Sequence, residues 1–202
     1  MNECKIALGI TDDDVVLGSH LIHFWRTDEE FELGTRFLQL GIDNPSEYCV
    51  LFGHDEANTR VLDVLRKTTR DLDRALADRR LVVLRRELSA PDTLAKIEAL
   101  FETAVQNGAT AIRYLGLFGM GRDPLPGKGP DEVIELETGA TALALRYPCV
   151  MVCMYDVNTA SGHLLLAGGF AAHPLAVWND ELEENHYCRG EKEPSLSGGR
   201  VA

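Results

Sequence analysis

The sequence predicts an α/β domain in which a mostly parallel sheet is covered by helices on both faces. Between Gly18 and about His186, short runs of strand-forming residues alternate with longer segments of helical periodicity, the pattern typical of such sheets. The 202 residues, 45% of them hydrophobic, suffice for one compact core. We therefore expect one domain over residues 18–187. It follows an N-terminal extension of residues 1–17 and precedes a flexible tail of residues 188–202, which has few apolar side chains to bury.

Five apolar runs have the length of buried strands. The last of them, Cys149–Tyr155, is the longest uninterrupted apolar run, yet it is far shorter than the roughly 18 residues that suggest a membrane span. Two further short runs, Leu175–Trp178 and the residues around His186, predict a terminal hairpin. The five predicted strands are His20–Trp25, Tyr48–Phe52, Leu81–Leu84, Ala111–Leu115 and Cys149–Tyr155.

Six segments between these runs have helical periodicity or helix-terminal signals. Thr27 can cap the first helix, whose first turn is acidic, and Asn107-Gly108 follows the fourth as a typical C-terminal signal. The last segment is interrupted by glycines. The six predicted helices are Asp28–Ile42, Asp55–Lys67, Asp71–Arg79, Ser89–Gln106, Asp131–Tyr147 and Thr159–Ala172.

Residues Gly116–Pro130 form the most loop-like stretch of the chain. This stretch is rich in glycine and proline, which no regular element tolerates at that density. It directly follows a predicted strand. We expect a long loop that could close over the strand ends when a ligand binds.

The charge of the chain argues against direct contact with nucleic acid. Twenty basic and thirty-two acidic side chains leave a net charge of −12, which would repel a phosphate backbone. The N-terminal segment lacks the basic region and long apolar stretch of an export signal, so we expect a cytoplasmic protein without a membrane partner. The five cysteines are odd in number and scattered, which favours reduced thiols over a disulfide framework.

Phosphate binding is not indicated where the first strand meets its helix. Residues Trp25–Glu30 contain no glycine-rich phosphate loop, and acidic residues occupy the helix start that an anion would need. The later Gly127-Lys128 is not followed by a hydroxyl residue, which that loop requires. We expect a non-catalytic protein with no identifiable cofactor. A nucleotide-binding ATPase with unorthodox phosphate contacts stays open as an alternative.

Polar residues gather instead near the ends of the first and fifth predicted strands. In open α/β sheets, ligands bind beyond the carboxyl ends of the strands. Because strand side chains alternate, His20 and His23 should face opposite sides of the sheet, whereas Cys153 and Tyr155 should share one side. We therefore expect a ligand-binding site built from polar and aromatic side chains. Its candidate residues are His20, His23, Trp25, Arg113, Cys153, Tyr155, Asp156 and His173.

Several of these residues have other readings that the sequence leaves open. His23, Cys153 and His173 are an alternative metal-ligand set, because imidazole and thiolate are typical zinc ligands. Cys153 could also be core packing, and a buried thiol is a poor nucleophile because burial raises its pKa. His173 could cap the preceding helix. Arg113 lies in a predicted strand and needs a carboxylate or a ligand anion.

The order and spacing of several short motifs resemble one protein family. The motifs are Gly18-Ser-His-Leu-Ile-His-Phe-Trp25, Phe37-Leu-Gln-Leu-Gly41, Cys153-Met-Tyr-Asp156, His173-Pro174 and Asn185-His-Tyr187. Together they resemble the MEDS domain, the sensory module of methanogen and methylotroph regulators such as DcmR.

The resemblance implies a RecA/KaiC-like three-layer fold that has lost its phosphate loop and serves as a sensory domain. It implies a small organic ligand, such as a one-carbon or hydrocarbon derivative, and a role in signal transduction and transcription regulation. The family's recurring polar positions correspond to His20, His23, Cys153, Tyr155, Asp156 and His173. Because no output segment accompanies the domain, the expected partner is a regulator or histidine kinase in trans. Homo-oligomerisation is compatible with the sequence.

Overall fold

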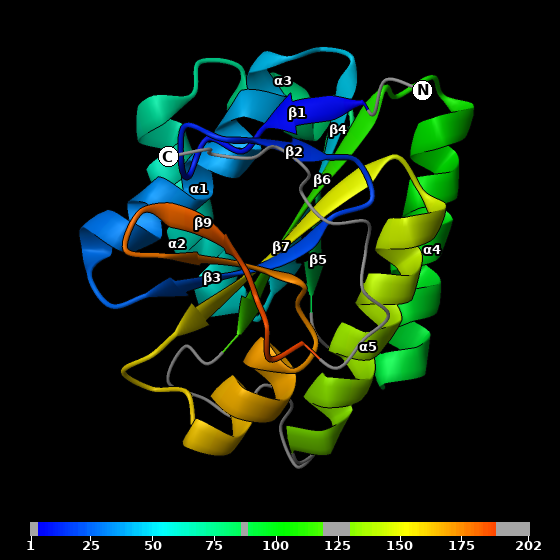
Figure 1. Cartoon of the computed structure of the whole chain (residues 1–202). Helices are drawn as coiled ribbons and strands as arrows, with labels where there is room; N and C mark the ends of the chain where they lie inside the picture. The colour runs from blue at the N-terminus through cyan, green and yellow to red at the C-terminus, as the bar shows by residue number, and fades with distance from the viewer. Residues whose placement is uncertain (1–3, 86–88, 119–129, 189–202) are drawn as a thin grey trace, which may run out of the picture.

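The computed structural model describes residues 4–85, 89–118 and 130–188. Its centre is a seven-stranded sheet with the order β5-β4-β6-β7-β3-β8-β9, in which every neighbouring pair is parallel except β8 and β9 (Figure 1). The α/β fold class with a mostly parallel sheet is therefore confirmed. The strands are β3 (His20–Trp25), β4 (Glu47–Gly53), β5 (Leu81–Arg85), β6 (Ala111–Phe118), β7 (Cys149–Asp156), β8 (Leu175–Trp178) and β9 (Glu181–Glu184).

Helices cover both faces of this sheet and bury one hydrophobic core on each side. The first core packs α1, α2 and α3 against one face, and the second packs α4, α5 and the π-helix η1 against the other. Three layers result, as the sequence predicts. The helices are α1 (Asp28–Asp43), α2 (Asp55–Thr68), α3 (Leu72–Ala77), α4 (Ala90–Gln106), α5 (Pro130–Arg146) and η1 (Leu164–Phe170). None of these described helices is long and apolar enough to cross a membrane.

The helix ends follow the local signals in the sequence. The side chain of Thr27 accepts a hydrogen bond from the backbone N–H of Glu30, and Ser89 caps α4 in the same way. Gly108 follows α4 with φ of +84°, a conformation that glycine adopts without strain. The predicted cap at Thr27 and the predicted helix end at Asn107-Gly108 are thus confirmed, and Ser89 caps α4 where the sequence placed the first residue of that helix.

Strand β6 is longer than predicted. It continues to Phe118, so Gly116–Phe118 belongs to the sheet and not to the predicted loop. Its central position between β4 and β7 supplies hydrogen bonds on both sides, and these outweigh the low strand propensity of Gly116. The rest of the predicted loop, residues 119–129, lies outside the described residues, as does most of the predicted tail.

The last predicted helix, Thr159–Ala172, is in large part a π-helix, η1. A Cβ at Gly169 would lie 2.8 Å from Cδ1 of Ile22 in β3, so glycine permits the close approach of η1 to the sheet. The predicted terminal hairpin is confirmed as β8 and β9. Its second strand ends at Glu184, before His186.

The predicted N-terminal extension contains a two-stranded antiparallel sheet, β1 (Lys5–Ala7) and β2 (Asp14–Val16). Leu8, Ile10 and Val15 of this segment are buried in the same core as α1. Strands of three residues are too short to produce a detectable alternation, which is why the sequence did not indicate them.

Candidate functional site

Four buried side chains from four different elements meet beneath α5. His20 is the first residue of β3, Cys153 lies in β7, Glu137 lies in α5, and His173 follows η1. Their ligand-type atoms all lie within 4.8 Å of one another. None of the four side chains is more than 1% exposed. We call His20, Glu137, Cys153 and His173 the buried quartet.

Short contacts connect the buried quartet around the carboxylate of Glu137. Sγ of Cys153 lies 3.2 Å from Oε2 of Glu137 and 3.3 Å from Nε2 of His20. The Nε2 atoms of His20 and His173 each lie 3.4 Å from the same Oε2 atom. The other carboxylate oxygen, Oε1, accepts a hydrogen bond of 2.6 Å from the hydroxyl of Tyr155. One carboxylate thus joins four strand or loop side chains to α5.

Hydrogen bonds outside the buried quartet fix the orientation of both imidazole rings. Nδ1 of His173 donates to the carbonyl oxygen of Gly169 at 2.7 Å, which confirms that this ring binds the end of the preceding helix. Nδ1 of His20 lies 2.8 Å from Oγ1 of Thr141. The Thr141 hydroxyl is in reach of backbone carbonyls, including that of Ala172 at 3.1 Å, so it donates there and accepts from His20. Both rings therefore direct Nε2 inward.

Burial and charge set the protonation states of this cluster. Burial, together with the neighbouring His173 ring, lowers the pKa of His20 to about 4 against the opposing effect of Glu137, so the His20 ring is neutral at pH 7. Burial alone would raise the pKa of Glu137. The two histidines outweigh that effect and hold the pKa of Glu137 well below its usual range. The carboxylate is therefore ionised although it is completely buried.

The structure brings four of the predicted site residues together and separates the other four. His20, Cys153, Tyr155 and His173 converge on Glu137. His23 faces the opposite side of the sheet, where its Nε2 lies 3.1 Å from the carbonyl oxygen of Glu30 in α1. The alternative metal set of His23, Cys153 and His173 is therefore not assembled. The four that lie elsewhere are His23, Trp25, Arg113 and Asp156.

Arg113 has the carboxylate partner that its buried position requires. Its Nε donates to Glu47, and both side chains are buried on the α1 side of the sheet. Its Nη1 donates to the carbonyl oxygen of Ala7 at 2.8 Å, which attaches the N-terminal segment to the sheet. The guanidinium group is thus bound within the protein.

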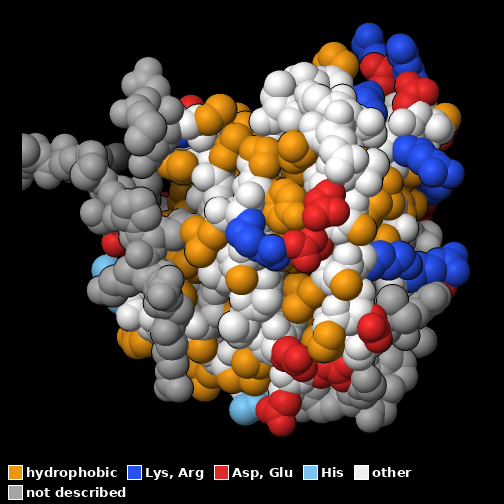
Figure 2. Space-filling model, turned by 90° about the vertical axis from the view of Figure 1, so that its right-hand side faces the viewer, with side chains coloured by type: hydrophobic (Ala, Val, Ile, Leu, Met, Phe, Trp, Pro, Cys, Tyr) orange, Lys and Arg blue, Asp and Glu red, His pale blue; other side chains and the backbone are white. Residues whose placement is uncertain are grey.

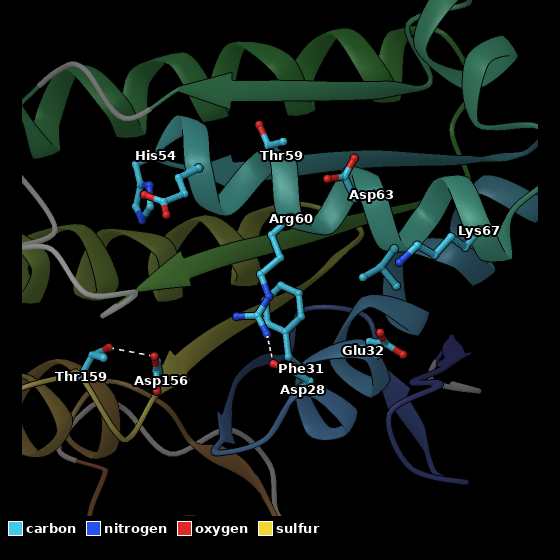
Figure 3. A pocket seen from close by; sticks show the side chains of 12 residues that line it. Asp28, Phe31, Glu32, His54, Thr59, Arg60, Asp63, Lys67, Asp156 and Thr159 are labelled. Atoms are coloured by element: carbon cyan, nitrogen blue, oxygen red, sulfur yellow. Dashed lines mark hydrogen bonds and ion pairs between the residues drawn. The ribbon is translucent and has the colours of Figure 1, made fainter.

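Trp25 and Asp156 lie at the carboxyl ends of β3 and β7, where the sequence predicted the ligand site. A pocket of about 620 Å³ opens at these ends between α1 and α2 (Figure 3). Asp156 lines this rim pocket, and the guanidinium group of Arg60, another lining residue, lies 4.9 Å from the Trp25 ring. The other lining residues are Asp28, Phe31, Glu32, His54, Glu56, Thr59, Asp63, Val64, Lys67 and Thr159.

The charge of the rim pocket is unfavourable for phosphate. Among the described lining residues, five are acidic and two are basic, and Arg60 is already paired with Asp28 at 2.6 Å. Protein carboxylates already occupy the start of α1. One of them, that of Glu30, accepts hydrogen bonds from the backbone and side chain of Arg26. A triphosphate would meet negative charge at this rim.

A second hollow lies between α5 and η1, beside the buried quartet. This α5–η1 groove has a volume of about 950 Å³. None of its described lining residues is charged, and the polar side chains among them are those of two threonines and a tyrosine. Figure 2 looks toward the α4 and α5 side of the molecule, where hydrophobic side chains reach the surface. The lining residues are Ile134, Thr138, Thr141, Ala142, Leu145, Leu166, Ala167, Phe170, Ala171, Ala172 and Tyr187.

Glu137 and Thr141 are site residues that were not predicted from the sequence. One signal was present, because Glu137 occupies an apolar stripe of α5 in which Val133, Ala140 and Ala144 are also buried. A carboxylate at such a position needs a partner in the core. What the stripe alone could not indicate is that this partner would be the His20 and His173 pair.

The comparisons with known proteins agree with the resemblance seen in the motifs. A family model described as the methanogen/methylotroph, DcmR sensory domain (MEDS) matches residues 19–174, most of the chain. Among curated proteins, none matches the chain. The matched range includes all four members of the buried quartet.

Proposed function

Because the chain belongs to the MEDS family of sensory domains, we propose that it is a non-catalytic ligand sensor whose ligand binds in the α5–η1 groove. The ligand class we propose is a small, mainly apolar organic molecule. The domain acts in the cytoplasm on a regulator or histidine kinase. The observation that carries this proposal is the uncharged groove directly beside the buried quartet.

The lining of the groove supports an apolar ligand. In a chain with 26% charged residues, eleven lining residues without a charge make an unusual surface. Leu145, Leu166 and Tyr187 are 54%, 66% and 78% exposed, so apolar area is available for a ligand to cover. Thr138 and Thr141 offer hydroxyl groups that would orient one polar end of such a molecule.

The size of the groove favours a hydrocarbon derivative over a one-carbon compound. A ligand with three heavy atoms gains at most about 4.5 kcal/mol at a ceiling of about 1.5 kcal/mol per atom, which corresponds to a Kd close to 1 mM. A groove of 950 Å³ accommodates a considerably larger molecule. Tight sensing therefore needs a ligand that fills more of it.

Thr141 supplies a route from the groove to the protein interior. It lines the groove, and its hydroxyl also contacts His20 and the carbonyl oxygen of Ala172. A ligand that competes for this hydroxyl would change both contacts at once. The opposite wall belongs to η1, and π-helices are uncommon segments that often occur at functional sites. Ligand binding would thus bias the position of η1 relative to α5.

The nucleotide-binding alternative has less support. A phosphate group would need an open helix N-terminus or a cationic cradle, whereas the rim pocket carries five acidic lining residues. The uncharged groove is the better candidate for ligand recognition.

The test is a panel of probes measured by NMR chemical-shift titration: dichloromethane, 1-butanol, benzene and heptanoate, with ATP and magnesium as a comparison. We expect the larger apolar probes to shift groove resonances at lower concentration than dichloromethane does. Ala142→Trp, which fills the groove, should abolish binding. Ala99→Trp is the matched control, because Ala99 is an exposed alanine of α4 outside the groove lining.

Two results would contradict the proposal. One is that no apolar probe binds below its solubility limit. The other is that Ala142→Trp and Ala99→Trp bind the probes equally. Tight binding of ATP with turnover would favour the nucleotide alternative.

A further inference from the structure

The buried quartet has the composition of a metal site. Two imidazoles, one thiol and one carboxylate are the ligand types that zinc takes in proteins. They come from β3, α5, β7 and the segment after η1, so no short sequence motif links them. With Zn²⁺, one thiolate and one carboxylate, the site would be electrically neutral, which suits groups that are almost completely buried.

The spacing of the four ligand atoms matches a small tetrahedron. Bonds of about 2.0 to 2.3 Å to a tetrahedral ion place neighbouring ligand atoms about 3.3 to 3.8 Å apart. The distances among the described atoms are 3.2 Å from Cys153 to Glu137, 3.3 Å from Cys153 to His20, and 3.4 Å from each histidine to Glu137. No pair is separated by more than 4.8 Å. Small side-chain adjustments would therefore suffice to surround an ion.

The hydrogen-bond pattern directs four ligand-type atoms at one centre. Nδ1 of His20 lies beside the Thr141 hydroxyl and Nδ1 of His173 donates to the carbonyl oxygen of Gly169, so the Nε2 atom of each ring faces the centre. Oε2 of Glu137 and the thiol of Cys153 face the same point. Apart from its 3.4 Å contact with Oε2 of Glu137, the buried Nε2 atom of His173 has no hydrogen-bond partner among the described residues. A cation at the centre would bind all four atoms together.

We propose that the buried quartet is a closed binding site for a divalent transition-metal ion, with zinc as the expected ion. Nε2 of His20, Nε2 of His173, Sγ of Cys153 and one carboxylate oxygen of Glu137 are its four ligands. On binding, the Cys153 thiol loses its proton to solvent and the sulfur coordinates as thiolate. Thr141 and Gly169 hold the outer nitrogen atoms of the two imidazoles, as partners of metal-bound histidines do. Since all four positions are filled by protein, the ion holds the fold together and does not activate water.

This inference goes beyond the ligand-sensing proposal and does not depend on it. The ion would nevertheless stabilise one wall of the α5–η1 groove, because His173 directly follows Ala172, a lining residue. Loss of the metal with unchanged probe binding, or loss of probe binding with the metal retained, would separate the two proposals experimentally.

The first experiment measures metal in the full-length chain, purified without chelators and without a metal-affinity column. Elemental analysis should find about one zinc ion per chain. Cys153→Ser should lower the zinc content at least tenfold. Cys149→Ser should retain it, because Cys149 is a buried thiol on the same face of β7 whose Sγ contacts the carbonyl oxygen of Ala144. His173→Gln and His23→Gln form a second matched pair, with loss expected only in the first.

The second experiment identifies the ligands without relying on variants that could fail to fold. X-ray absorption of the wild-type zinc protein should give a first shell of one sulfur and three nitrogen or oxygen atoms. Protein refolded with cobalt should give the visible bands of tetrahedral Co²⁺ and a thiolate charge-transfer band that Cys149→Ser retains. The proposal is overturned if the wild-type chain binds neither metal after refolding, if the shell contains no sulfur or several, or if Cys153→Ser keeps the ion and the charge-transfer band.

Discussion

The two faces of the central sheet each bury a histidine of β3, and only one of these histidines belongs to a cluster. His23 packs on the α1 side, where a Cβ at Gly34 would lie 2.9 Å from its Cδ2 atom, and its Nε2 meets a single backbone carbonyl oxygen. His20, three residues earlier, meets a thiol, a carboxylate and a second imidazole on the α5 side. Burial is nearly equal, 3% exposure against 1%. Burial of a histidine therefore does not distinguish a packed side chain from a candidate site.

What distinguishes the two faces is the convergence of several elements on one point. On the α5 side, β3, β7, α5 and the segment after η1 each contribute one polar group to the buried quartet. On the α1 side, the buried ion pair of Arg113 and Glu47 joins β6 to β4 and also binds a backbone carbonyl group of the N-terminal segment. The first arrangement directs four ligand-type atoms at one point, whereas in the second the donors of Arg113 are bound to a carboxylate and a carbonyl oxygen. The first is therefore the better candidate for a ligand or an ion.

The largest effect on stability is expected from a substitution at Glu137. Glu137→Ala should lower the free energy of unfolding by about 3 to 5 kcal/mol, because it removes the acceptor of the Tyr155 hydroxyl and leaves the facing imidazoles without their carboxylate. Glu135→Ala, at an exposed position of the same helix, should change it by less than about 0.5 kcal/mol. Urea unfolding at pH 7 measures both. If Glu137→Ala lowered the free energy of unfolding by less than about 1 kcal/mol, the stability of the fold would not depend on this carboxylate.

The next largest effect on stability is expected at Gly34, on the opposite face of the sheet. A Cβ at this position would lie 2.4 Å from Cε of Met154, so Gly34→Ala forces α1 away from the sheet and should cost about 1 to 3 kcal/mol. Gly162→Ala is the control, since a Cβ there meets nothing within 4 Å. Equal midpoints of thermal unfolding for the two variants would mean that the Met154 side chain moves aside with no loss of stability.

The contrast between the faces also shows how far the sequence can predict this site. The two-residue period of strands correctly separated His20 from His23 and grouped Cys153 with Tyr155, because it depends on local backbone geometry alone. Glu137 and Thr141 were not predicted, because the strand order β6-β7-β3 determines which helix covers this face. That order arises from packing between distant segments. The helix caps at Thr27 and Ser89 were predictable for the opposite reason, since each involves residues only three positions apart.

A smaller effect is expected from the titration of His23. Burial lowers the pKa of His23 below its usual value of 6.5, so the unfolded chain binds a proton that the folded chain rejects. Stability should therefore fall as the pH drops below about 6.5. His23→Gln should make this decline shallower by up to about 1.4 kcal/mol per pH unit, the equivalent of one proton. Unfolding free energies measured from pH 7 to pH 5 give both slopes, and identical slopes would mean that His23 is protonated in the folded chain.

The smallest effect is expected where the α5–η1 groove meets the buried quartet. Thr141→Val keeps the shape of the side chain but removes the hydroxyl that contacts His20 and Ala172, so it should cost about 1 kcal/mol. Thr138→Val is the matched control on the same helix, because Thr138 is exposed and its hydroxyl bonds to the carbonyl oxygen of Ile134, one turn earlier in α5. Chemical unfolding gives the stability of both variants, and the NMR probe titration shows whether groove and quartet remain coupled. If probe binding still shifts the His20 ring resonances in Thr141→Val as in the wild type, the coupling passes through η1 and not through the threonine hydroxyl.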